Sequence, residues 1–135
     1  IQARREPRRV IFVDTNVIMY AVGREHPLRP EAQAFFVESL ASNEVLVTSA
    51  EVLQELLHAY LVANRIETLD TALSLARARI QTVWPVEAED VDLARLLVDR
   101  HPGLGARDLL HVACCSRRDV VRVQTFDRGL AAAFA

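Results

Sequence analysis

The sequence predicts an α/β fold, a three-layer α/β/α sandwich with a central parallel sheet of four or so strands. Short apolar segments that suit buried strands alternate with longer segments whose apolar residues recur at helical spacing. Strands that alternate with helices pair in parallel through right-handed crossovers. A chain of 135 residues without internal repeats suits one domain. We therefore expect a basic N-terminal tail at residues 1–8 and a single domain at residues 9–135.

The first half of the chain is expected to contain two strands and three helices. The apolar run Val10–Val13 leads directly into Asp14, which is typical of a buried parallel strand that ends at a polar site. Apolar residues then recur at helical spacing, at Ala32, Phe35, Phe36 and Leu40. The expected elements are a strand at 9–14, helices at 15–22 and 30–42, a strand at 44–47 and a helix at 49–64.

The second half repeats this alternation. The sequence His101-Pro-Gly-Leu-Gly interrupts the helical periodicity, because proline and glycine are the strongest breakers of regular structure. A helix is expected on each side of this break. The expected elements are a helix at 68–80, a short strand at 82–86, helices at 88–100 and 106–117, a strand at 120–124 and a terminal helix from about 127.

Charge and cysteine content narrow the class of protein. The net charge is −2 and all 16 basic residues are arginine, whose planar guanidinium suits phosphate contacts. The tail sequence RREPRR is either solvated or an arm that touches nucleic-acid phosphates. No apolar run approaches the ~18 residues of a membrane span, so no membrane partner is expected. Cys114 and Cys115 are the only cysteines; adjacent cysteines rarely pair, which favours the reducing cytoplasm.

Four carboxylates occur where strands end or where the following helices begin. Asp14 follows the first expected strand, and Asp127 follows the last. Asp108 begins a helix, and Glu55 lies within two turns of the start of the helix that follows the second strand. In a parallel sheet, the segments after the strands open on one edge, which is where such sheets place their sites. The four side chains are therefore predicted to converge.

Each of these carboxylates also has a purely structural interpretation. The three aspartates can cap helix N-termini or complement helix dipoles. Glu51 is an alternative to Glu55, but Thr48 and Glu51 have the spacing of a capping box, which would give Glu51 a structural role. We therefore expect Glu55 to belong to the site.

A shared cation would account for the four charges together. Two like charges ~4 Å apart repel by about 4 kcal/mol at an effective dielectric near 20. A divalent cation reverses the sign of this interaction, and carboxylate oxygens with water suit Mg²⁺ or Mn²⁺. Such a centre lowers the pKa of water and neutralises charge on a phosphate, so it is suited to hydrolysis of phosphodiesters.

At these positions the sequence resembles the PIN-domain nucleases, most closely the small VapC-type toxins. The matching segments are VDTNV at 13–17, TSAEVLQELLHAY at 48–60, ARDLLHVA at 106–113 and TFDRGL at 125–130. They lie in family order over nearly the whole chain. Many members continue into a further short strand, whereas this sequence ends at Ala135, so the resemblance does not define the edge of the sheet.

The resemblance implies a PIN domain at 9–135 that acts as a Mg²⁺-dependent endoribonuclease toxin of a type II toxin–antitoxin system. It implies Asp14, Glu55, Asp108 and Asp127 as catalytic and metal-binding residues. Asn16 and Thr125 are implied as polar support. RNA would be cleaved by metal-activated water, oriented by Asp14 or Asp108, to give 5′-phosphate and 3′-hydroxyl ends. The implied partners are an RNA substrate, a small VapB-type antitoxin and a second copy of the chain in a homodimer.

The remaining charged and polar residues include candidates for substrate contacts. Removing the four carboxylate charges changes the net charge from −2 to +2, which is compatible with an RNA ligand. Arginines beside the matching segments are candidate phosphate ligands: Arg24, Arg107, Arg117 and Arg128. His111, three residues after Asp108, either lines the site or packs in the core, and we favour packing. The cysteine pair is also expected to pack in or beside the core.

Several other classes are excluded by missing residues. Receiver domains and phosphoaspartyl enzymes normally need a late lysine, and the chain has no lysine. A P-loop needs a glycine-rich run that ends in lysine, and dinucleotide sites need GxGxxG; neither occurs. Two alternatives stay open: a PIN nuclease of RNA processing, and a non-catalytic PIN-like module that binds RNA or protein.

Overall fold

The computed structural model describes residues 8–135, so Arg4 and Arg5 of the tail, expected to be solvated or to touch phosphates, lie outside the described residues. The four-stranded sheet is entirely parallel, in the order β3-β2-β1-β4. Its strands are β1 (Val10–Val13), β2 (Val45–Ser49), β3 (Thr82–Trp84) and β4 (Val123–Gln124). Because β2 and β4 lie on opposite sides of β1, the chain changes direction across the sheet there. Ligand sites of such sheets lie at this switch point.

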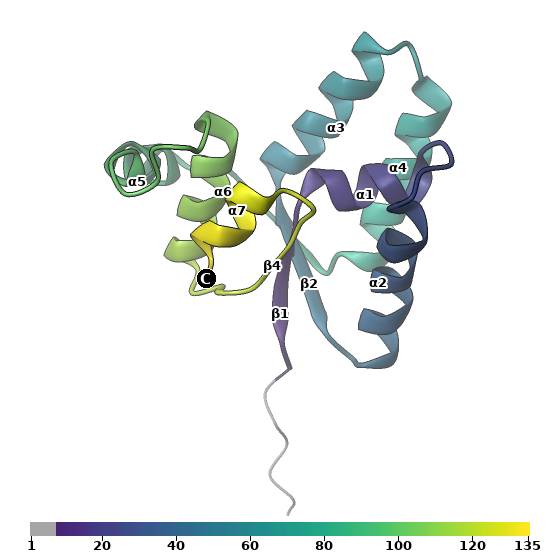
Figure 1. Cartoon of the computed structure of the whole chain (residues 1–135), viewed down its shortest axis with the longest axis horizontal. Coiled ribbons are helices and arrows are strands. Elements are labelled where there is room, and N and C mark those ends of the chain that lie inside the picture. Colours follow the sequence, from purple (N-terminus) through teal and green to yellow (C-terminus); the bar gives the residue numbers. More distant parts are fainter. Residues whose placement is uncertain (1–7) are drawn as a thin grey trace, which may run out of the picture.

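Within residues 8–135, seven helices cover the two faces of the sheet and confirm the α/β class and layer order (Figure 1). Four helices lie on one face, and the last three lie on the other. The first group is α1 (Thr15–Val22), α2 (Arg29–Ala41), α3 (Ala50–Val62) and α4 (Ile66–Arg79). The second group is α5 (Ala88–Leu97), α6 (Ala106–Arg117) and α7 (Arg128–Ala133).

The core explains why β1 is almost uniformly apolar. Phe12 and Val13 are both fully buried, because helices cover both faces of this central strand. The main cluster joins β1 and β2 to α1–α4, and a smaller cluster that includes Leu97, Leu109 and Leu130 joins α5, α6 and α7. Cys114 and Cys115 are buried free thiols, as expected. Within residues 8–135, no helix is long and apolar enough to cross a membrane.

Three helices end on an asparagine or aspartate in the left-handed region, where glycine is more usual. Asn43, Asn64 and Asp119 have φ values of 55°, 53° and 57°, and each lies just after the C-cap residue of α2, α3 or α6. At the end of α3, the Asn64 amide bonds the Leu61 carbonyl and the Arg65 amide bonds the Tyr60 carbonyl. This double closure satisfies carbonyls that the helix leaves free and reverses the chain sharply.

Most element boundaries differ from those expected by one to three residues, and three of the differences have a clear local cause. The helix α2 begins one residue early, at Arg29, with Pro30 in its first turn, where the missing amide proton costs nothing. The helix α5 ends at Leu97, and a turn occupies the residues to 100. The strand β4 covers only two residues, because the amide of Val120 still bonds the Cys115 carbonyl at the end of α6.

Candidate metal centre

Asp14 lies at the carboxyl end of β1 and caps the N-terminus of α1. Its Oδ1 accepts a hydrogen bond from the Thr15 amide at 2.8 Å, and its Oδ2 accepts one from the Thr125 hydroxyl at 2.7 Å. The residue is only 5% exposed. Burial raises the pKa of Asp14 above its usual value, despite these hydrogen bonds and the nearby His111. The fold therefore holds a carboxylate where burial disfavours its charge.

Asn16 and Thr125 hold the ends of β1 and β4 together. The Asn16 side-chain amide donates to the Thr125 hydroxyl oxygen at 3.3 Å, and its carbonyl oxygen accepts from the Phe126 amide at 3.1 Å. The Thr125 oxygen also accepts from the Asp127 amide at 3.0 Å. Both side chains thus contact the loop that carries Asp127, and Thr125 bonds Asp14 directly.

Glu55 approaches from the second turn of α3. Its Oε2 accepts a short hydrogen bond of 2.5 Å from the Thr15 hydroxyl, and its Oε1 lies 3.0 Å from Nε2 of His111. Burial alone would raise the pKa of Glu55, but the contacts with His111 and Thr15 bring it below its usual value. This carboxylate is thus ionised and held between α1 and α6.

The predicted capping box of Thr48 and Glu51 is wrong. The N-cap of α3 is Ser49, whose side chain makes no capping hydrogen bond. Thr48 instead donates its hydroxyl to the Val13 carbonyl at 2.8 Å, because β1 and β2 lie side by side. Glu51 lies 4.0 Å from the Arg107 guanidinium. Glu55 lines the cavity of the other carboxylates and Glu51 does not. The expected choice of Glu55 over Glu51 therefore agrees with the structure, although the capping box on which it rested does not form.

His111 is fully buried, as favoured from the sequence, and it also contacts two of the predicted site residues. Its Nε2 lies 3.7 Å from Oδ1 of Asp14 as well as beside Glu55. Burial would lower the pKa of His111, but Glu55, Asp14 and Asp108 raise it. The only feature of the sequence that pointed to a role of His111 in the site was its position three residues after Asp108. Residues three apart in a helix lie next to each other on its surface.

Asp108 and Asp127 occupy the rim of the same site. Asp108 lies in the first turn of α6, whose N-cap is Gly105. Burial and the charges of Asp14, Asp127 and Glu55 raise the pKa of Asp108, while His111 opposes them. Asp127 is exposed and caps α7, since its Oδ1 accepts from the amides of Gly129 at 2.8 Å and Leu130 at 3.1 Å. Capping thus uses Oδ1 of Asp127, and its other carboxylate oxygen takes no part in the cap.

All four predicted carboxylates line one cavity of about 600 Å³, but they are not equally close. Ligand atoms of Asp14, Glu55 and His111 lie within 4.8 Å of one another, and within residues 8–135 this is the one such group. Asp108 and Asp127 face the same space without joining it. Burial raises the pKa of both Asp14 and Asp108, and the neighbouring carboxylates add to this effect. Converging carboxylates of this kind suit a divalent cation, which would remove the repulsion. The residues therefore fit a metal site.

The four candidate arginines divide by position. Arg107 is exposed and lines the carboxylate cavity, and Arg24 lines a second cavity beside it. Arg128 is exposed next to Asp127 but lines neither cavity. Arg107 and Arg24 are thus the two candidates that line a cavity at or beside the carboxylates.

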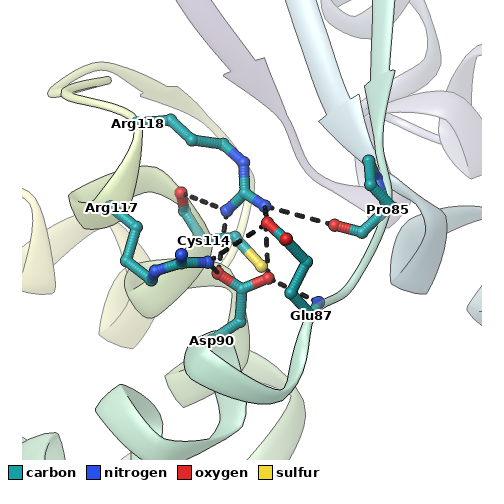
Figure 2. Close-up of polar contacts among 6 residues, drawn as sticks. All are labelled: Pro85, Glu87, Asp90, Cys114, Arg117 and Arg118. Atoms are coloured by element: carbon teal, nitrogen blue, oxygen red, sulfur yellow. Dashed lines mark hydrogen bonds and ion pairs between the residues drawn. The ribbon is translucent and has the colours of Figure 1, made fainter.

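Arg117 lies elsewhere, in an ion-pair cluster between α5 and α6 (Figure 2). Its guanidinium Nη1 is 2.8 Å from Oδ1 of Asp90 and 3.3 Å from Glu87. Arg118 binds the same two acids and lies 5.0 Å above the ring of Trp84. The prediction of Arg117 as an RNA ligand came from its place in the sequence, and its contacts give it a structural role instead.

Comparison with known proteins agrees with this fold. The family model described as PIN domain matches residues 11–134. The chain is 62% identical over 125 residues to ribonuclease VapC23 of Mycobacterium tuberculosis, covering 93% of this chain and 98% of the relative. It is 41% identical over 120 residues to ribonuclease VapC13 of the same species, covering 89% of this chain and 92% of that one.

Solved structures confirm the fold. The crystal structure of VapC20 from Mycobacterium tuberculosis, a sarcin–ricin loop cleaving toxin, aligns with a TM-score of 0.68 at 23% identity and covers 91% of this chain and 94% of that one. VapBC2 from Rickettsia felis, bound to a DNA fragment from its promoter, aligns with a TM-score of 0.67 at 20% identity and covers 87% of each chain. Because it carries these strand-end carboxylates and is similar to these proteins along nearly its whole length, the chain belongs to the PIN-domain family, among the VapC ribonucleases.

Proposed function

We propose that this ribonuclease is a Mg²⁺-dependent endoribonuclease toxin of a toxin–antitoxin pair, with Asp14, Glu55, Asp108 and Asp127 as its metal-binding and catalytic residues. The observation that carries the proposal is the single cavity that these four carboxylates line. Asp14 and Glu55 would hold the ion most closely, with Asp108 and Asp127 reaching it directly or through water. Oxygen donors of this kind favour Mg²⁺, and Mn²⁺ also fits.

In this proposal the side chains have separate tasks. When bound, Mg²⁺ lowers the pKa of water and neutralises charge that develops on a phosphate. Asp14 or Asp108 orients the attacking water, and the raised pKa of Asp108 suits it to accept a proton. Thr15 and His111 fix both oxygens of Glu55. In-line attack then expels the 3′ oxygen and leaves 5′-phosphate and 3′-hydroxyl ends.

The proposed partners are RNA, a small VapB-type antitoxin and a second copy of the chain, in the cytoplasm. Support comes from apolar side chains of α3 that the core does not use. Leu56 and Tyr60 are buried, whereas Leu57, Leu61 and Val62 are 44%, 52% and 76% exposed. Exposed aliphatic side chains grouped on one helix are typical of a protein contact surface. Inducing the chain alone tests the toxin role, since RNA cleavage without growth arrest would favour an RNA-processing nuclease.

Mg²⁺ is expected to stabilise the folded protein. Binding at ten times its dissociation constant contributes about 1.4 kcal/mol, which raises the melting temperature of a domain of this size by roughly 4 °C. Differential scanning fluorimetry with and without MgCl₂ measures the shift, and NaCl at the same ionic strength is the control. Equal melting temperatures in the two salts would count against a built metal site.

Glu55→Gln and Glu51→Gln form a matched pair on α3. Glu55→Gln is expected to lower Mg²⁺-dependent RNA cleavage by about 100-fold, because the amide loses the charge that holds the cation. Glu51→Gln is expected to stay within about threefold of the unmodified chain, since Glu51 does not line the cavity. Cleavage of labelled RNA in MgCl₂ and in EDTA measures both. Equal losses in the two variants would remove Glu55 from the proposed site.

A further inference from the structure

We propose that a second cavity, which we call the side pocket, binds a nucleotide next to the scissile phosphate of single-stranded RNA. The side pocket has a volume of about 600 Å³ and lies between α1, the segment that follows it and the end of α3. The inference rests on the proposed ribonuclease function and assigns it a subsite. Its lining includes Asn16, Tyr20, Arg24, His26 and Arg65.

The side pocket adjoins the carboxylate cavity. Asn16 and Met19 line both spaces. Tyr20 lies one turn further along α1 than Asn16, about 6 Å along the helix axis. An RNA strand whose phosphate sits among the carboxylates must leave that cavity, and the side pocket is open to the nucleotide that follows. The position of the side pocket next to the carboxylate cavity favours RNA over a peptide as the occupant.

Aromatic rings in the side pocket suit a base. The rings of Tyr20 and His26 have centroids 4.6 Å apart, with a tilt of 34° between their planes. Phe126 packs edge-on against Tyr20 with centroids 5.5 Å apart, so the Tyr20 ring is held from the core side. Tyr20 is half-buried and His26 is exposed. Stacking on such rings holds unpaired bases with little regard to sequence.

Two arginines supply positive charge for the backbone. Arg24 and Arg65 line the side pocket, and within residues 8–135 neither has an acidic side chain within ion-pair distance. Glu25 is the only acid among the lining residues. The carboxylate cavity is strongly acidic, so a cationic neighbour that takes up the next phosphate complements it.

The backbone builds this arrangement at two points. A Cβ at Gly23 would lie 2.7 Å from the Met19 carbonyl oxygen, so only glycine lets the chain leave α1 so closely and carry Arg24 back beside the helix. Asn64, with its φ of 53°, turns the chain after α3 and places Arg65 against the opposite wall. The two arginines therefore come from separate turns that both face the side pocket.

Removing single bases from the RNA tests the stacking contact. The intact probe is a fluorescein-labelled 12-nucleotide single-stranded RNA that the unmodified chain cleaves once. Two abasic probes have the same sequence, and each carries one abasic residue, either directly before or directly after the cleaved bond. One abasic probe is expected to lose 10- to 100-fold in kcat/KM with the unmodified chain and with Tyr20→Phe, which keeps the ring. With Tyr20→Leu, the same probe and the intact RNA are expected to agree within about twofold.

Equal abasic losses with Tyr20→Phe and Tyr20→Leu, or none with the unmodified chain, would overturn the proposal. If Tyr20→Leu does not fold, His26→Ala serves instead, because His26 is exposed, and it is expected to reduce the abasic loss at least threefold. Fluorescence anisotropy of the probes in EDTA gives the same comparison without cleavage. If the unmodified chain cleaves no RNA, the proposed metal-dependent nuclease activity is refuted. The binding measurements in EDTA would still decide whether the side pocket binds a base.

Charge removal tests the phosphate contacts. Arg24→Gln and Arg65→Gln are each expected to raise KM several-fold and to reduce the salt slope of log KM by about 0.7, the value for one phosphate on a single strand. Arg77→Gln is the matched control, because Arg77 is exposed and lines a cavity beside Asn43, before the start of β2. If all three variants behave alike, the proposal fails. It also fails if the side-pocket variants weaken binding of the antitoxin and leave RNA cleavage unchanged.

Discussion

Asp14→Asn is expected to reduce Mg²⁺-dependent RNA cleavage by more than about 100-fold while the fold is retained. The substitution removes one full negative charge from the most buried of the four carboxylates. The asparagine carbonyl oxygen can still accept the Thr15 amide and cap α1, so the local backbone keeps its contact. The loss would therefore fall on the cation and on the water that Asp14 orients. Cleavage of labelled RNA in MgCl₂ measures it, with circular dichroism as the check on folding.

The same variant separates an electrostatic role from a structural one. Burial raises the pKa of Asp14, so the ionised form lowers the stability of the folded state at neutral pH when no cation is bound. Asp14→Asn is thus expected to be at least as stable as the unmodified chain in EDTA and to lose the stabilisation by MgCl₂. Asp70→Asn, an exposed site on α4, is the control and should change neither property. Full cleavage by Asp14→Asn would refute the assignment of the centre.

Most of the fold could be predicted because periodicity and order are local properties of the sequence. Apolar runs that end in polar residues marked the strands, and their alternation with helices fixed parallel pairing. The convergence of Asp14, Asp108 and Asp127 in one cavity followed from the same rule, since parallel strands end at one edge. The sheet order explains why the site lies beside the carboxyl ends of β1 and β4, because the direction of the chain changes between them.

Side-chain partners were less predictable, because they depend on which elements approach each other. Thr48 has the spacing of a capping residue, but its hydroxyl donates to the carbonyl of Val13 on the neighbouring strand instead. His111 was identified as a packed residue, yet its contact with Glu55 joins α3 to α6, which are far apart in the sequence. Arg117 lies close to a matching segment and points away from the site. No local pattern distinguishes these outcomes.

Asp90→Ala is expected to lower the free energy of unfolding by about 2–4 kcal/mol, the largest stability effect of any single substitution considered. Asp90 is fully buried and accepts four hydrogen bonds: from Arg117, twice from Arg118 and from the Glu87 amide, at 2.8–3.2 Å (Figure 2). Removing it leaves both guanidinium groups with only the exposed Glu87 of their two shared acids and opens the capping box of α5. Urea denaturation measures the loss.

Asp92→Ala is the matched control on the same helix. Asp92 is exposed, so its removal is expected to change the free energy of unfolding by less than about 0.5 kcal/mol. A similar small change for Asp90→Ala would show that the cluster contributes little to stability. RNA cleavage is expected to stay near normal in both variants when they are folded, because Asp90 contacts the end of α6 opposite to Asp108.

The pH dependence of stability gives this cluster a separate signature. Burial would raise the pKa of Asp90, but the hydrogen bonds from Arg118, Glu87 and Arg117 hold it well below its usual range. A carboxyl whose pKa is depressed in the folded state stabilises the protein above the unfolded pKa, near 3.9, and loses that contribution as the pH falls towards the folded value. Stability below about pH 4 should therefore fall more steeply in the unmodified chain than in Asp90→Ala. Parallel acid titrations of the two proteins would instead mean that Asp90 is not held ionised by the arginines.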